Sequence, residues 1–224
     1  MTLSFSAVPP PCPPSPPFPP LSPVARPPRP RHRARRPGLP GQAGFSLVEI
    51  SIVTAIILVI SIIGIPAINS YVIENKVPEV AGELQRYVAR TKANGQGTSN
   101  PYTAIDTANL GRALRSSSVV SVETATFGRV AHGLGGNGTS TGLVTVAPSD
   151  SGASFTLTLD AVNDAACPAL ASLLQRVSER IEITGASTIL VKDARAATPL
   201  AYSPIATQAA CQVGDNNTFA FTVW

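Results

Sequence analysis

The chain has 224 residues, of which 44% are apolar, 13% are charged and 5% are aromatic. This composition is too apolar for a disordered protein and too poor in charge for a typical cytosolic enzyme. The net charge of +4 is unevenly placed, because residues 1–44 hold six arginines and no acid, and the 11 basic and 13 acidic residues that follow sum to −2. Nucleic acid binding by the residues after 44 is therefore not expected.

Residues 1–44 form a proline- and arginine-rich head that is not expected to fold, since they contain 15 of the 22 prolines. Proline lacks the N–H that helices and central strands need, and the segment has little to bury. A proline-rich ligand for another domain is an alternative. Met1 is the only methionine, so a shorter head would need a different start codon, for example at Val24.

A run of 24 residues without charge follows, from Ile50 to Ile73. As a helix rising about 1.5 Å per residue it is long enough to cross a bilayer, and a single span in lipid has to be helical. The arginines of the head keep the N-terminus cytoplasmic and send the rest of the chain across the membrane. The run is too long for a signal peptide, and no small-x-small site follows it. A plain membrane anchor is the alternative.

The flank of this run carries a specific pattern. Gly44, Phe45 and Glu49 precede the apolar helix, and Pro66 lies late in it. A basic leader that ends in glycine, followed by phenylalanine and then by glutamate five residues after the cut, resembles the type IV prepilins and their pseudopilin relatives. The resemblance covers about 30 residues and is specific as a combination.

This resemblance implies that a prepilin peptidase cleaves between Gly44 and Phe45 and methylates the new N-terminus of Phe45. The α-amine of Phe45 would then pair with Glu49 of a neighbouring subunit and fix the stagger of a helical polymer. An unpaired carboxylate in lipid costs about 2–4 kcal/mol, which gives the pairing a physical reason. The alternative is that Glu49 lies at the membrane interface, in a first helical turn where negative charge is favoured.

Apolar residues beyond Ile73 recur at steps of three and four, which predicts an amphipathic helix. They are Val77, Val80, Leu84, Tyr87 and Val88. Asn94-Gly95 gives a stop signal. We expect one helix from Phe45 to around Lys92, with residues 45–73 in the membrane and residues 74–94 packed on an exported globular domain of residues 95–224.

Two prolines, Pro66 and Pro78, interrupt this predicted helix and should kink it. The alternative is two helices broken at Pro78.

The globular part reads as an α+β fold with a mainly antiparallel sheet, which agrees with the type IV pilin fold that the resemblance implies. Helices are predicted at 103–114 and 167–181, the second with an apolar stripe that reaches Ile181. Strands are predicted at 117–126, 142–146, 153–162, 181–191 and 218–224. In the third of these, Phe155, Leu157 and Leu159 share one face.

The cysteines fit the same resemblance. Cys12 lies in the head that cleavage would remove, which leaves Cys167 and Cys211 on the exported side, where oxidation is expected. Pilins pair a cysteine near the C-terminus with an earlier one, so a Cys167–Cys211 disulfide is implied, with two free thiols as the alternative. The setting of both cysteines is similar to the type IVb group, and within it to the PilS-like major pilins of thin conjugative pili.

Catalytic chemistry is not predicted. The Gly133–Gly138 segment matches GxGxxG, but it neither follows a convincing strand nor opens a helix, which favours a hairpin loop. His132 is the only histidine after residue 44, so histidine metal clusters and Ser/His/Asp triads lack parts. We expect no enzyme activity, no metal and no other cofactor.

The sequence thus predicts a structural type IV pilus subunit that is held in the inner membrane, with its body in the periplasm, and then polymerises with itself into an extracellular filament. The resemblance implies three protein partners: prepilin peptidase, an inner-membrane platform and an assembly ATPase. Alternatives are a minor pilin, a type II secretion pseudopilin, or a membrane-anchored periplasmic binding domain that does not polymerise. Filaments of this family serve adhesion, motility, DNA transfer (conjugation) or secretion, and all four stay open.

Overall fold

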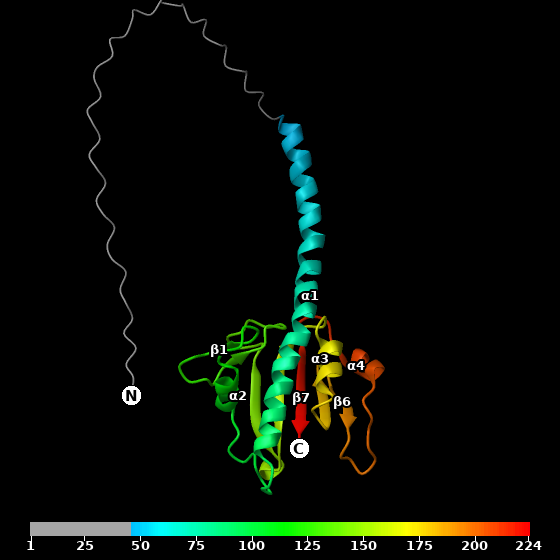
Figure 1. Ribbon diagram of the computed structural model, residues 1–224. Coiled ribbons are helices and arrows are strands. Elements are labelled where there is room, and N and C mark those ends of the chain that lie inside the picture. The colour runs from blue at the N-terminus through cyan, green and yellow to red at the C-terminus, as the bar shows by residue number, and fades with distance from the viewer. Residues whose placement is uncertain (1–45) are drawn as a thin grey trace, which may run out of the picture. The chain divides into compact units, whose positions relative to one another are not determined.

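The computed structural model describes residues 46–224 (Figure 1). The predictions for residues 1–45, including the head and the cleavage pair Gly44 and Phe45, lie outside the described residues.

The first element, α1 (Leu47–Asn94), is a single helix of 48 residues. It ends where Gly95 donates its N–H to the carbonyls of Thr91 and Lys92, at 3.0 and 3.2 Å. The prediction of one long helix is confirmed, and the alternative of a break at Pro78 is wrong. Proline at this position has no N–H to donate, but the neighbouring Val77 is fully buried and packing holds the helix together.

A five-stranded antiparallel sheet forms the centre of the rest of the chain, with strand order β3-β4-β7-β5-β6. The strands are β3 (Val144–Ser149), β4 (Ser154–Val162), β5 (Arg180–Thr184), β6 (Thr188–Asp193) and β7 (Asn217–Val223). The last strand therefore occupies the middle of the sheet, and the sheet is complete only when the C-terminus is in place. The predicted α+β class is confirmed.

The core lies between α1 and one face of this sheet. Phe155, Leu157 and Leu159 of β4 are buried, as their alternation predicts, and Phe219 and Phe221 of β7 lie beside them with stacked rings. The stripe predicted on α1 packs against this face. Its members are all buried: Val77, Val80, Leu84, Tyr87 and Val88. Figure 1 shows the lower part of α1 crossing in front of the sheet, with α3 beside it.

Three short helices and a small hairpin complete the fold. The helices are α2 (Thr107–Leu114), α3 (Cys167–Leu174) and α4 (Pro204–Ala210), with a 3-10 turn at Asp150–Gly152, and β1 (Ser121–Val122) pairs with β2 (Val130–Ala131). The Asp106 carboxylate accepts the N–H of Asn109 at 2.8 Å and sets the start of α2, four residues later than predicted. No pattern had predicted α4, β2 or the 3-10 turn.

One predicted helix is partly wrong. The helix predicted for 167–181 ends at Leu174. Ile181 belongs to β5, and only by coincidence does its position fit the helical spacing of the apolar residues in α3. The chain turns there, and Lys192 donates to the carbonyls of Gln175 and Ser178 at 2.5 and 2.6 Å.

Two predicted strands also need correction. The strand predicted for 181–191 is a hairpin of two strands, β5 and β6, and the strand predicted for 117–126 is reduced to Ser121–Val122. The other three predicted strands are confirmed as β3, β4 and β7, with bounds shifted by three residues at most.

Candidate assembly site

The N-terminal half of α1 is an apolar helix that nothing in residues 46–224 covers. Large apolar side chains are exposed on every side of it, from Leu47 at 89% to Val72 at 42%, and Ile73 is the first buried residue among those whose side chains the structure describes. By length and composition, this is the one helix in the described part of the chain that is able to cross a membrane. A helix that is apolar all round needs lipid or protein around it.

Three hydroxyl groups in this half form hydrogen bonds within the helix itself. Ser51, Thr54 and Ser61 donate to the carbonyls of Val48, Ile50 and Ile57, at 2.8, 2.8 and 2.7 Å. A hydroxyl that bonds its own helix exposes no unpaired donor to lipid, so these residues are compatible with a membrane span.

Glu49 lies in the first turn of α1 and is the only charged residue between 46 and 73. Within residues 46–224 it forms no hydrogen bond or ion pair, and its side chain is exposed. The structure therefore has one carboxylate at the N-terminal end of an exposed apolar helix. A cation or an N–H donor from outside the described residues would satisfy it. Its predicted partner, the amine of Phe45, lies outside those residues.

The second half of α1 is fixed to the sheet by polar contacts beside the apolar stripe. Gln85 donates to the carbonyl of Leu173 at 2.8 Å, and Lys92 forms an ion pair with Glu179 at 2.9 Å. These contacts tie the helix at two levels, to α3 and to the start of β5.

A disulfide joins Cys167, the first residue of α3, to Cys211, just after α4, with a sequence separation of 44. The implied pairing is confirmed and the alternative of free thiols is wrong. The bridge closes the segment that carries β5, β6 and α4, and Cys167 is fully buried. In the chain-entropy view such a loop stabilises the fold by about 4 kcal/mol.

The GxGxxG segment is the loop between β2 and β3, as predicted. Several of its amides are already used inside the chain, because Gly136 donates to Asp215 at 2.9 Å, and Asn137 and Gly138 donate to the side chain and carbonyl of Thr141. A phosphate site needs free N–H groups, so this arrangement favours structure over nucleotide binding.

His132 begins this loop as a buried, fully satisfied side chain. Its Nδ1 accepts the N–H of Leu134 at 3.0 Å, so its Nε2 carries the proton and donates to the carbonyl of Asp160 at 2.8 Å. Burial lowers the pKa of His132. The ring is therefore neutral and structural.

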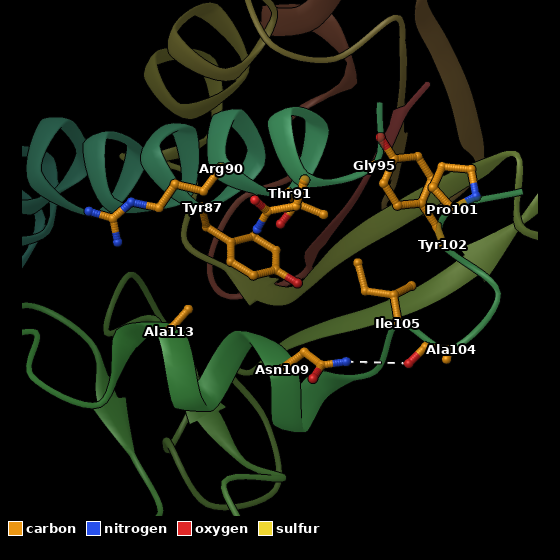
Figure 2. Close-up of a pocket in the computed structure, with 11 residues that line it drawn as sticks. Tyr87, Arg90, Thr91, Gly95, Pro101, Tyr102, Ala104, Ile105, Asn109 and Ala113 are labelled. Carbon is orange, nitrogen blue, oxygen red and sulfur yellow. Dashed lines mark hydrogen bonds between the residues drawn. The ribbon is translucent and has the colours of Figure 1, made fainter. Parts of the chain in front are cut away.

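The sequence predicted that Tyr87 belongs to the apolar stripe of α1, but it did not predict where the hydroxyl of this side chain lies. Figure 2 shows the Tyr87 side chain extending from α1 toward α2, into a cavity of about 430 Å³ that Tyr102 and Ile105 also line. The signal that could have found it is a single tyrosine in an otherwise aliphatic stripe, because a buried phenol needs a hydrogen-bond partner.

A family model described as PilS N terminal matches residues 78–224, which do not include the flank and apolar run that carry the prepilin pattern. The comparison with curated proteins gave no significant match.

The solved structures that are similar to this chain include the following two. One is a type IV b pilin from Salmonella typhi, with 18% identity, a TM-score of 0.43, and coverage of 66% of this chain and 96% of that chain. The other is TcpA, a type IV pilin from Vibrio cholerae El Tor biotype, with 14% identity, a TM-score of 0.38, and coverage of 68% and 99%.

Proposed function

The chain belongs to the PilS N-terminal family of pilin structural subunits, and from this we propose that it is a prepilin, cleaved and then polymerised into a type IV pilus. Family membership confirms the resemblance to type IVb pilins. It also agrees with the expectation that the protein is a structural subunit and not an enzyme.

The observation that carries the proposal is the exposed apolar half of α1, continuous with a half that is firmly packed on the sheet. Lipid covers the exposed half before assembly, and the same helices of other copies cover it in the filament. One surface therefore serves two environments in turn, both of them apolar.

Cleavage and methylation of the N-terminus distinguish a pilin from a plain membrane anchor. Cleavage after Gly44 removes residues 1–44, and Phe45 becomes the methylated first residue. Its amine pairs with Glu49 of a neighbouring copy. The support is that Glu49 is a lone carboxylate with no partner in residues 46–224, at the start of an apolar helix. In an anchor that never polymerises, no neighbouring copy would supply an amine to pair with this charge.

Location and partners follow from the same proposal. Residues 45–73 span the inner membrane, residues 74–94 continue the helix, and residues 95–224 lie in the periplasm until the subunit enters the extracellular filament. The prepilin peptidase processes the chain, and a membrane platform with its ATPase drives assembly. Pro66 and Pro78 let α1 bend as subunits pack, because neither can donate a backbone hydrogen bond.

A pair of matched variants tests the proposal in cells that make the filament. Glu49→Ala should be cleaved normally and inserted in the membrane, yet be absent from sheared filaments. Glu74→Ala removes an exposed acid from the same helix, just beyond the apolar run, and should assemble like the unaltered chain. Normal filaments from Glu49→Ala would refute the role of this carboxylate, and a lack of cleavage after Gly44 would favour the anchor.

A further inference from the structure

A small polar pocket lies on the face of the sheet that is directed away from α1. Its floor includes Thr156 of β4 and Ala220 and Thr222 of β7. These residues alternate along their strands with buried ones such as Phe155 and Phe221, which belong to the core under α1. The pocket has a volume of about 200 Å³, which is less than drug-sized ligands need, so it suits a molecule with one small ring.

Charges of both signs line this pocket. Arg180 of β5 donates to Glu182 at 2.5 Å, and Asp150 lies at the turn between β3 and β4. The hydrogen bond with Glu182 raises the pKa of Arg180, and the negative charge of Asp150 adds to this rise. The guanidinium repels a cationic ligand and the two carboxylates repel an anionic one. A neutral ligand therefore fits the pocket best.

Two acceptors at the pocket are only half used. One oxygen of Glu182 accepts from Arg180, and one oxygen of Asp150 accepts the Ser154 hydroxyl at 2.9 Å. The second oxygen of each carboxylate forms no hydrogen bond or ion pair within residues 46–224. Each can accept the hydroxyl of a ligand, in a hydrogen bond that is stronger than one between neutral groups.

Hydrogen-bond donors line the same pocket. The hydroxyl of Ser149 has no acceptor within residues 46–224. Thr156 and Thr222, the threonine pair, share one hydrogen bond of 3.2 Å between their hydroxyls, which leaves one of the two O–H groups free to donate. A sugar ring donates and accepts through each of its hydroxyl groups, so it can use both the donors and the acceptors of this pocket.

Trp224 adds a flat apolar surface to the polar groups. It lines the pocket together with Ala220. The guanidinium of Arg195 lies 5.1 Å from the centroid of the Trp224 ring, a contact that helps to hold the indole in place. The C–H groups of a sugar ring form an apolar face, and an indole combines an apolar ring with an N–H donor.

We propose that this pocket binds a neutral sugar, a single pyranose ring with free hydroxyl groups. These hydroxyls donate to the free oxygens of Asp150 and Glu182, and they accept from Ser149 and the threonine pair. The apolar face of the ring lies against Trp224. The pocket is on the opposite side of the sheet from α1, so the inference does not rest on polymerisation.

Fluorescence of Trp224 tests the proposal, because this residue is the only tryptophan in the chain and lines the pocket. The full chain is kept in a polyoxyethylene detergent, since alkyl-glycoside detergents would compete as sugars. The neutral probes are the methyl pyranosides of glucose, galactose and mannose, and the charged probes are those of glucosamine and glucuronic acid. At least one neutral probe should change the fluorescence, give saturation transfer by NMR, and bind about tenfold more tightly than both charged probes.

Variants then assign the contacts. Thr156→Val keeps the shape of the side chain and removes its hydroxyl, so the best neutral probe should bind about two- to tenfold more weakly. Thr158→Val is the matched control, because Thr158 lies on the same face of β4 outside the pocket, and it should bind normally. Asp150 has φ of +47°, which asparagine tolerates, so Asp150→Asn should fold and bind about tenfold more weakly.

Two results would overturn the inference. One is that no neutral probe changes the fluorescence or gives saturation transfer, or that a charged probe binds as tightly as the best neutral one. The other is an unchanged affinity for the neutral probe in Thr156→Val or Asp150→Asn, with circular dichroism like that of the unaltered chain. Neither result affects the pilin proposal, and both variants should still enter filaments.

Discussion

Lys92 and Glu179 form an ion pair with 2.9 Å between Nζ and Oε1, and this pair links the last turn of α1 to the segment that leads into β5. The other oxygen of Glu179 accepts the N–H of Trp224, the C-terminal residue, at 3.1 Å. One carboxylate therefore holds the end of the long helix and the end of the chain. Because β7 is the central strand, this contact also secures the middle of the sheet.

The first prediction separates the two roles of Glu179. Glu179→Ala should lower the free energy of unfolding by about 1–2 kcal/mol, since it removes an ion pair and leaves the Trp224 N–H without its acceptor. Lys92→Ala removes only the partly exposed ion pair and should cost less than about 1 kcal/mol. Urea denaturation measures both. Equal losses in the two variants would contradict the double role of Glu179.

The second prediction concerns the disulfide. Replacing Cys167 and Cys211 together by alanine should destabilise the globular part by about 2–4 kcal/mol, because the unfolded chain is no longer constrained across a long loop. Thermal unfolding of the variant checks this. The unaltered chain in excess reductant is the control and should unfold at a similarly reduced temperature. Unchanged stability in both would show that the bridge does not hold the segment that contains α4.

The third prediction compares two glycines of the GxGxxG loop. A Cβ at Gly135 would lie 2.3 Å from the carbonyl oxygen of Ala161, and the residue has φ of +144°, whereas a Cβ at Gly133 meets nothing within 4 Å. Gly133→Ala, at φ of +66°, should cost about 1 kcal/mol through backbone strain alone. Gly135→Ala should cost more than about 2 kcal/mol, because backbone has to move.

Denaturant midpoints of these two variants measure the difference. They also test the interpretation of the GxGxxG segment as a closely packed structural loop. If Gly135→Ala is no more destabilised than Gly133→Ala, the close packing of this loop on residues 161–163 is wrong.

The fourth prediction is a pH effect from His132. Its pKa is lowered in the folded chain, so the unfolded chain binds more protons below the ordinary histidine pKa of about 6.5. Stability should therefore be fully present above about pH 6.5 and fall as the pH drops below it, by up to about 1.4 kcal/mol per pH unit.

A His132→Gln variant isolates this effect from that of the carboxylates. The stability difference between the two chains should be constant above pH 7 and shrink as the pH falls from about 6.5. A difference that does not change with pH would mean that His132 is not buried in its neutral form.

Long, regular patterns were readable from the sequence. The α1 stripe from Val77 to Val88 and the alternation of Phe155, Leu157 and Leu159 are both confirmed, because each repeats the period of its element over several residues. The glycine and glutamate of the flank indicated the pilin family. The family model matches residues 78–224, so it supports this prediction from a different part of the chain.

Short or tertiary features were not readable. Ile181 continues the helical spacing of α3 but lies in β5, since the hairpin with β6 and the pairing with β7 outweigh local spacing. α4 has only seven residues, and β2 has two, so neither gives a periodic signal. The orientation of the Tyr87 hydroxyl depends on how α2 and residues 101–105 pack against α1. The spacing of apolar residues in the sequence does not predict this packing.

The N-terminal residue of the main protein in sheared surface filaments tests the central claim most directly. The proposal predicts a filament subunit that begins with methylated Phe45, followed by Ser46, Leu47, Val48 and Glu49, as read by peptide mass spectrometry. Filaments that lack this protein, or a protein that is found only with residues 1–44 still attached, would contradict it.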